Sequence, residues 1–404
     1  MRILVLDSIH GGKVIADHLT RHGHETDVID VYRRQEGISP DLARHLTYDL
    51  IVAPVHLDPG YPLLRDIKAP VISHHAAVRW IIAGEIKGPV IEITGKQGKS
   101  TTAAALAFVM PGAGILQSSS GLVRYPEKEK MGRYSITPAS LLTACSQIPA
   151  SGWMIAEISL GFCGIGDLGI LTSGVDYPVA NGKKSAFAIK AGQSHLLSTV
   201  LVPQGVPLAH DGAVRITDLV EVTDGVACYQ YGDISGSFSN PLLLLPGYQT
   251  PLLLAAGAAL LLGIDPKGLS DFPALPGRME LTRDSGYTII DNANSGTCFQ
   301  TTIDAFRYGQ EVAGEVAVTL IIGQESASVC ENFATEEIIT SILKVRPHMV
   351  ILIPGDDRIK CDEIAQYCTE GDIGFTLARS GEEGTRLAKV QNNPLILLSV
   401  KRWK

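Results

Sequence analysis

One stretch decides the expected fold: Val90-Ile91-Glu92-Ile93-Thr94-Gly95-Lys96-Gln97-Gly98-Lys99-Ser100-Thr101-Thr102-Ala103-Ala104-Ala105-Leu106. A β-branched run stops at Gly95, Gly98-Lys99-Ser100 follows, and a helix-forming segment begins at once. A strand, a glycine-rich loop and a helix in this order form a phosphate-binding loop, because glycine lets backbone N–H groups surround an anion at the helix N-terminus. The stretch therefore predicts a nucleoside triphosphate site built from Thr94, Gly95, Lys96, Gln97, Gly98, Lys99, Ser100 and Thr101.

Two side chains of this loop have the chemistry that a triphosphate requires. Lys99 is expected to reach the outer phosphates, and the Ser100 hydroxyl to ligate Mg²⁺. The glycine spacing departs from the usual pattern, since Ile93 stands where its first glycine would be. The tighter spacing of Gly95 and Gly98 is typical of one subset of ATP-using enzymes. The alternative is a plain strand-to-helix turn, and the flanking strand and helix argue against it.

Composition narrows the class of protein. The chain has 404 residues, 45% of them hydrophobic and 19% charged, which predicts a globular protein of two or three domains. A net charge of −8 argues against a general nucleic-acid binder. The 7 cysteines are scattered, which is typical of free thiols in a reducing compartment. The apolar run 252–262 is too short to span a membrane. A cytoplasmic protein that binds neither nucleic acid nor membrane is expected.

Strand and helix signals alternate along the chain, which predicts α/β domains with parallel sheets. Residues 1–85 are expected to form a Rossmann-like substrate domain, with strands at 2–7, 26–31, 50–55 and 70–73. Residues 86–272 are expected to form the ATP-binding domain and 273–404 a C-terminal α/β domain. A helix is predicted over 250–262, with Thr250 as its N-cap and Pro251 in its first turn.

A carboxylate stands inside the apolar strand predicted at 153–158. Burying Glu157 there is costly unless it meets a cation. A Mg²⁺ ion between Ser100 and Glu157 would meet that need. The alternative places Glu157 at a solvated edge or against a basic side chain.

Four motifs in order resemble those of the Mur ligase superfamily, the ATP-dependent ligases of peptidoglycan and folylpolyglutamate synthesis. They are Thr94-Gly95-Lys96-Gln97-Gly98-Lys99-Ser100-Thr101, Glu157-Ile158-Ser159-Leu160, Leu275-Pro276-Gly277-Arg278-Met279-Glu280 and Asp291-Asn292-Ala293-Asn294-Ser295. The resemblance implies a three-domain α/β architecture with a Rossmann-like domain at each end and a central P-loop ATPase domain. It also implies that ATP activates a substrate carboxylate as an acyl phosphate.

The resemblance assigns roles to further residues. Arg278, Asp291 and Asn294 would contact the nucleotide from the third domain, and Gln249 lies near a family asparagine that contacts adenine. Lys190 lies near the position of a carbamylated lysine on a second Mg²⁺, so that Lys99, Glu157 and Lys190 are the candidate catalytic residues.

Departures from the family pattern narrow the range of expected substrates. The segment 172–177 has no histidine for a second metal, and 294–296 replaces the family His-Asn-Pro. The C-terminal region also lacks the Asp-Asn-Pro signature of peptide-forming relatives. These departures resemble a branch of the superfamily that closes a carbocyclic ring on one nickel tetrapyrrole acid, for which His10, His56, His74 and His75 are the candidate contacts. An amide ligase joining an amino acid to a small acid is the alternative, and an inactive nucleotide-gated binding protein is the alternative from another class.

Overall fold

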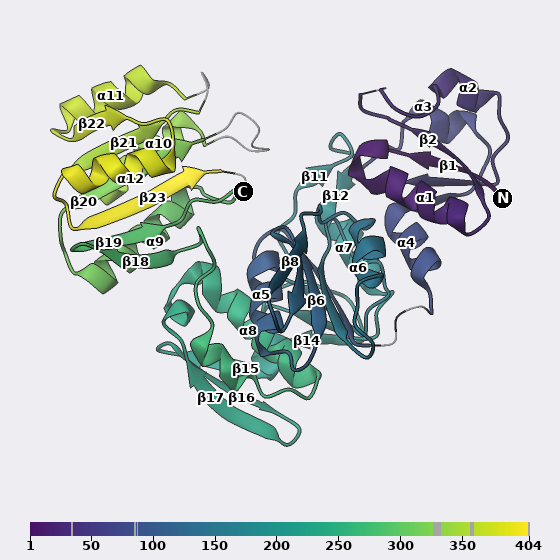
Figure 1. The fold of residues 1–404 in the computed structure, drawn as a ribbon, viewed down its shortest axis with the longest axis horizontal. Helices are drawn as coiled ribbons and strands as arrows, with labels where there is room; N and C mark the ends of the chain where they lie inside the picture. Colours follow the sequence, from purple (N-terminus) through teal and green to yellow (C-terminus); the bar gives the residue numbers. More distant parts are fainter. Residues whose placement is uncertain (34, 85, 87, 326–332, 356–358, 403–404) are drawn as a thin grey trace. The chain divides into compact units, whose positions relative to one another are not determined.

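The chain folds into two compact units in the computed structural model (Figure 1), which describes residues 1–402 except 34, 85, 87, 326–332 and 356–358. One unit comprises Met1–Leu244 and Tyr248–Phe272, and the other comprises Leu245–Gly247 and Pro273–Lys404. The expected division into three domains stays a prediction, and its first boundary, residue 85, lies outside the described residues. In the described part of the chain, every helix is too short or too polar to cross a membrane.

The first unit begins with a small parallel sheet in the order β2-β1-β3-β4. Its strands are β1 (Arg2–Leu6), β2 (Glu25–Ile29), β3 (Leu50–Ala53) and β4 (Val71–Ser73). A short π-helical turn, η1 (Ser8–Gly12), joins β1 to α1 (Lys13–Arg21), and α2 (Pro40–Arg44), α3 (Pro62–Asp66) and α4 (His74–Ile82) complete this part. Buried Ile, Leu and Val side chains of β1 pack on both faces of the sheet, as a parallel sheet covered by helices requires.

A larger sheet carries the phosphate-binding loop, in the order β14-β13-β10-β5-β9-β6-β7-β8. Its strands are β5 (Val90–Thr94), β6 (Gly114–Ser118), β7 (Gly121–Tyr125), β8 (Glu129–Gly132), β9 (Trp153–Glu157), β10 (Leu168–Leu171), β13 (Val200–Val202) and β14 (Ala213–Arg215). β5 lies between β9 and β10 and is parallel to both, so the three strands end at one edge. The loop after β5 and the residues after β9 and β10 therefore lie side by side.

The rest of the first unit surrounds this sheet. It includes the helices α5 (Lys99–Val109), α6 (Ser140–Cys145), α7 (Ala186–Ser194) and, from Tyr248 on, α8 (Pro246–Leu261). It also includes the short helices η2 (Ile216–Asp218), η3 (Pro241–Leu244) and η4 (Pro266–Asp271), the pair β11 (Pro178–Val179) and β12 (Lys184–Ser185), and the sheet of β15 (Val220–Thr223), β16 (Val226–Tyr231) and β17 (Ile234–Ser239). The helix predicted over 250–262 was placed wrongly at its start: α8 begins at Pro246, so Pro251 lies inside it rather than in its first turn. Pro246 supplies the first-turn proline that the prediction assigned to Pro251.

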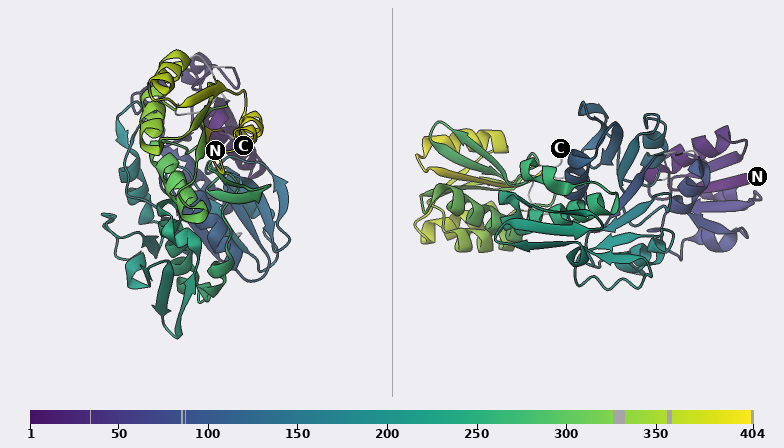
Figure 2. Two further views of the ribbon diagram at one scale, coloured as in Figure 1. Left: turned by 90° about the vertical axis from the view of Figure 1, so that its left-hand side faces the viewer. Right: turned by 90° about the horizontal axis from the view of Figure 1, so that it is seen from below.

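The second unit is a six-stranded sheet in the order β18-β19-β23-β20-β21-β22, parallel except for β18. Its strands are β18 (Glu280–Asp284), β19 (Tyr287–Asp291), β20 (Val318–Gln324), β21 (Met349–Ile353), β22 (Gly374–Leu377) and β23 (Leu395–Lys401). Helices α9 (Phe299–Ala313), α10 (Thr335–Val345) and α11 (Cys361–Glu370) pack on one face, and α12 (Gly381–Val390) packs on the other (Figure 2). The α/β class expected from the alternating pattern is confirmed.

A buried carboxylate fixes the loop that follows β9. The side chain of Glu92 in β5 is fully buried, and its two oxygens accept the backbone N–H groups of Cys163, Gly164, Ile165 and Gly166 at 2.6–3.2 Å. Burial raises the pKa of Glu92, and these donors oppose the rise. The loop is held without secondary structure of its own because one side chain satisfies its donors.

We expect Glu92→Gln to destabilise the first unit by about 3 kcal/mol or more, because an amide NH₂ would face donors that now meet an oxygen. Urea unfolding followed by fluorescence measures the change. Glu129→Gln is the matched control, since Glu129 is exposed and pairs with Arg124 on the surface. Equal midpoints for the Glu92 variant and the wild type would contradict the assigned role.

Candidate nucleotide site and adjoining pocket

The first candidate site is a cluster of three side chains at the edge where β5 and β9 end. Ser100 Oγ donates a hydrogen bond to Glu157 Oε2 at 2.9 Å, and Lys99 Nζ lies 3.7 Å from Glu157 Oε1. The backbone N–H of Ser119 also donates to Glu157 Oε2, at 3.0 Å. Glu157 is 3% exposed, so the carboxylate is buried but paired. The structure thus brings together the residues that the sequence singled out for phosphate and metal binding.

The oxygen atoms of Ser100 and Glu157 suit a magnesium ion. Mg²⁺ binds oxygen ligands at 2.0–2.1 Å in octahedral geometry, which places neighbouring ligands about 3 Å apart. The Ser100 Oγ to Glu157 Oε2 distance of 2.9 Å matches that spacing. The alternative of a solvated edge for Glu157 does not fit its burial. The contact with Lys99 fits two roles for Glu157. Glu157 is either the ion-pair partner of Lys99 or a metal ligand whose negative charge Lys99 balances.

Neighbouring strands hold the phosphate-binding loop in place. Thr94 Oγ1 donates to the carbonyl of Ile158 at 2.9 Å, and Thr172 Oγ1 donates to the carbonyl of Gln97 at 2.5 Å. Gly95 has a φ of +147°, and a Cβ atom there would lie 2.1 Å from Thr172 Oγ1. Only glycine allows this approach. The loop geometry therefore depends on Thr172, at the end of β10, a residue absent from the sequence-based site.

Other loop residues fill structural positions. The Lys96 N–H donates to Ser173 Oγ at 3.0 Å, Gly98 caps α5 with a φ of +83°, and Thr101 is buried in the first turn of that helix. The α5 N-terminus thus has no side-chain cap, which leaves its first N–H groups available to an anion.

Lys190 lies buried on α7, where its Nζ is 4.6 Å from the centre of the Tyr177 ring and 3.4 Å from the Tyr177 hydroxyl. Burial, followed by repulsion from Lys99, lowers the pKa of Lys190 to about 8. A lysine with a pKa of about 8 is about one-tenth neutral at pH 7, far more than a lysine with the usual pKa, and the neutral form is the one that reacts with carbon dioxide. The carbamylation implied by the resemblance stays a prediction.

The remaining residues predicted to contact the nucleotide lie on different elements of the chain. Gln249, on α8, donates its side-chain amide to the carbonyl of Leu243 at 2.9 Å. In the second unit, Asp291 Oδ2 accepts from Arg402 at 3.3 Å, and Asn294 Nδ2 donates to the carbonyl of Gly277 at 2.8 Å. Asn294 is thereby tied to the residue before Arg278. These residues stay predicted contacts, and Arg402 is a charged neighbour that sequence reasoning missed.

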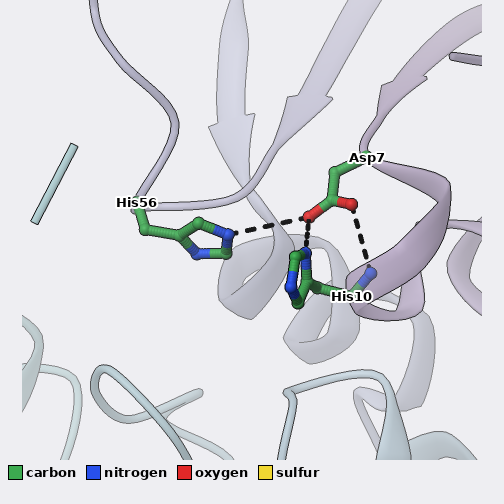
Figure 3. Close-up of side chains that lie close together, drawn as sticks. All are labelled: Asp7, His10 and His56. Atoms are coloured by element: carbon green, nitrogen blue, oxygen red, sulfur yellow. Dashed lines mark hydrogen bonds and ion pairs between the residues drawn. The ribbon is translucent and has the colours of Figure 1, made fainter. Parts of the chain in front are cut away.

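A pocket of about 250 Å³ adjoins the first site, and its lining is mostly apolar. The four histidines named from the sequence, His10, His56, His74 and His75, all line it, together with Ser159 and Leu160 from the segment that follows Glu157. Asp7, at the end of β1, contacts two of these histidines (Figure 3). Sequence reasoning missed Asp7, although a carboxylate at a strand end, three residues before His10-Gly11-Gly12, was the available signal.

Known proteins resemble this chain over most of its length. A family model described as "Coenzyme F430 synthetase CfbE, C-terminal domain" matches residues 281–402. The coenzyme F(430) synthetase of Methanosarcina acetivorans is 31% identical over 82% of this chain and 85% of its own length. The chain belongs to the coenzyme F(430) synthetase family. This membership supports an ATP-dependent ligase and confirms the resemblance to the Mur ligase superfamily.

The fold of this chain is also similar to that of several solved ligase structures. A pseudomurein peptide ligase type C from Methanothermus fervidus aligns over 99% of this chain and 97% of its own, with a TM-score of 0.53 and 15% identity. The MurF ligase of Thermotoga maritima, solved with ADP, aligns over 90% of this chain and 87% of its own, with a TM-score of 0.54 and 13% identity. The Mur-ligase-like architecture predicted from the sequence is confirmed.

We expect Lys190→Met to raise the melting temperature most at pH 7 and below, where the wild type buries a charged ammonium. The unfolded pKa is near 10.5 and the folded pKa is about 8, so wild-type stability rises with pH between these values. The gain of the variant should therefore fade above pH 8 and vanish near pH 11. Thermal unfolding in buffers freed of carbon dioxide measures it, with exposed Lys130→Met as the control. A gain that does not depend on pH would contradict the lowered pKa.

Proposed function

We propose that this protein uses ATP to activate a propionate carboxylate of a nickel seco-tetrapyrrole as an acyl phosphate, and then closes a carbocyclic ring by intramolecular C-acylation to give coenzyme F(430). The substrate carboxylate attacks the γ-phosphorus and ADP leaves. A carbon of the same molecule then displaces phosphate from the acyl group.

The cluster of Lys99, Ser100 and Glu157 is the observation that carries the first half-reaction. Phosphoryl transfer requires positioning and neutralisation of the phosphate oxygens more than covalent chemistry from the protein. Lys99 supplies positive charge beside the uncapped N-terminus of α5, and both face the same loop. Arg278, Asp291 and Asn294 are proposed to contact the nucleotide from the second unit.

Magnesium is proposed to bind at Ser100 and Glu157, where the oxygens already have the spacing of neighbouring ligands. When bound, the ion would neutralise charge on the phosphate oxygens during transfer. Lys99 would then hold the outer phosphates while Ser119 and Ser100 keep the Glu157 carboxylate oriented.

The second half-reaction is supported by family membership and by the chain's departures from amide-forming ligases. The segment 172–177 lacks a histidine, and 294–296 lacks the His-Asn-Pro of those relatives. A reaction within one molecule needs no pocket for an incoming amine, because the macrocycle itself supplies the high effective concentration of the second reactant.

We expect the purified protein to release phosphate from ATP when the nickel seco-tetrapyrrole acid is the only other substrate. Lys99→Ala should abolish this release and leave the protein folded, because Ser100 and the Ser119 N–H still donate hydrogen bonds to Glu157 when the 3.7 Å contact with Lys99 is lost. A coupled phosphate assay, with and without a mixture of amino acids, measures turnover. Release that requires an amino acid would favour an amide ligase, and release unchanged in the variant would remove the role assigned to Lys99.

We expect Glu157→Gln to raise the Mg²⁺ concentration for half-maximal turnover by about tenfold or more, because even loss of an outer partner of a metal ligand costs about 10–100-fold in metal affinity. Titration of Mg²⁺ at saturating ATP measures the shift. Glu129→Gln serves as control, since Glu129 is a surface residue. An unchanged titration would favour a purely pairing role for Glu157 with Lys99.

A further inference from the structure

The proposed ring closure requires a base. The carbon that attacks the acyl phosphate must lose a proton, and a side chain within hydrogen-bond reach of it can take that proton. The base must lie in a space that the substrate can enter, close to the phosphate-binding loop. The pocket lined by His10 and Ser159 meets the second condition, because Ser159 follows Glu157 by two residues, about 7 Å along an extended chain.

An aspartate–histidine pair opens onto this pocket (Figure 3). Asp7 is fully buried, and its Oδ2 lies 2.6 Å from His10 Nδ1. Asp7 Oδ1 accepts the backbone N–H groups of Ile9 at 3.0 Å and His10 at 3.1 Å, which fixes the carboxylate. Because His10 Nδ1–H donates to Asp7, its Nε2 carries the lone pair. That nitrogen has no hydrogen-bond partner in the described part of the chain, and the side chain is 45% exposed.

The backbone around the Asp7–His10 pair is conformationally strained. Asp7 has a φ of +78°, and Leu160, across the pocket, has a φ of +58°. Residues other than glycine rarely adopt a positive φ, and such backbone strain is common at functional sites. Gly12 permits the turn, since a Cβ atom there would lie 2.1 Å from the Asp7 carbonyl oxygen. The backbone conformation of residues 7–12 therefore serves to hold the Asp7–His10 pair.

The other histidines of the pocket are poorly placed to accept a proton. His74 Nε2 is 2.9 Å from the Leu6 carbonyl, and His75 Nε2 is 3.0 Å from the Ser159 carbonyl, so both rings are held as donors. Burial lowers the pKa of each to about 4. His56 Nε2 lies 3.7 Å from Asp7 Oδ2, too far for a hydrogen bond to orient it.

The same atoms could be read as a metal site, because ligand atoms of Asp7, His10 and His56 lie within 4.8 Å of one another. The distances favour the hydrogen-bonded pair. Ligands of one transition metal at 2.0–2.1 Å lie about 3 Å or more apart, whereas Asp7 and His10 approach to 2.6 Å. That separation is typical of a charge-assisted hydrogen bond.

We propose that His10 Nε2 is the general base of the ring closure and that Asp7 positions it, an inference that rests on the proposed function. The imidazole takes the proton from the attacking carbon of the tetrapyrrole acid. The electron pair of that C–H bond forms the bond to the acyl carbon, the acyl–phosphate C–O bond breaks, and phosphate leaves. The hydrogen bond to Asp7, followed by burial, which opposes it, gives a net rise in the pKa of His10, as suits a base working near neutral pH.

The cavity is too small for a whole macrocycle, since sites for drug-sized ligands occupy about 300–1,000 Å³. At about 250 Å³, it fits the reacting edge of the substrate, with the propionate and the carbon it will join. The apolar lining then keeps water from the acyl phosphate, which would otherwise hydrolyse.

The test separates the two half-reactions. Wild-type protein and His10→Gln receive ATP, Mg²⁺ and the nickel seco-tetrapyrrole acid, with hydroxylamine to trap the acyl phosphate as a hydroxamate in parallel reactions. In His10→Gln, ring closure should fall by about 10²–10⁴-fold, the usual contribution of a general base, while hydroxamate formation stays within a few-fold of the wild type. Asp7→Asn should show the same split, because its amide would favour the wrong tautomer of His10.

His45→Gln is the matched control, since His45 is exposed and lies outside the pocket. Ring closure within a few-fold of the wild type in His10→Gln, or equal losses of hydroxamate and ring product, would overturn the assignment. So would a divalent ion present at one per wild-type chain and lost from His10→Gln, which would make the cluster a metal site. Failure of the wild type to form either hydroxamate or ring product would instead refute the proposed function itself.

Discussion

The buried carboxylate of Glu157 is the constraint on which the candidate nucleotide site depends. A negative charge at the end of a central strand is tolerated only because Ser100, Lys99 and the Ser119 N–H surround it. Those contacts tie the strand end to the phosphate-binding loop and to the turn after β6. The same chain then continues through Ser159 and Leu160 into the wall of the pocket. One buried charge thus couples the loop that holds phosphate to the space proposed for the acid.

A second buried carboxylate, at the first sheet, is also satisfied by the groups around it. Asp7 is fully buried at the end of β1, and backbone N–H groups and His10 satisfy its oxygens. Although burial raises it, the hydrogen bond from His10 and the nearby ring of His56 bring the pKa of Asp7 well below its usual range. In both cases a carboxyl end of a parallel strand carries the charge, which is where open α/β sheets place their functional groups. The segments that follow these two strand ends contribute His10, Ser159 and Leu160 to the lining of one pocket in the first unit.

Much of the candidate site was open to sequence reasoning because its members are close in sequence or sit in recognisable motifs. Gly95, Gly98, Lys99 and Ser100 form one local pattern, and Glu157 stands out as a charge in an apolar strand. Ser119, Thr172 and Arg402 were missed, because each contributes through a contact with a distant segment. Asp7 was missed although its partner His10 is only three residues away. The start of α8 was misplaced because two prolines, Pro246 and Pro251, each fit the first turn of a helix, and propensity alone does not choose between them.

The sequence by itself determined the α/β class, the phosphate-binding loop and the family, since these follow from local periodicity and from motifs whose backbone requirements are strict. Only the tertiary structure decided which carboxylates meet which partners. It placed Ser100 Oγ 2.9 Å from Glu157, and it set His10 against Asp7 with one ring nitrogen left toward the pocket. The reason is physical: strand order in a sheet brings together residues far apart in the chain, and their separation along it carries no record of that pairing.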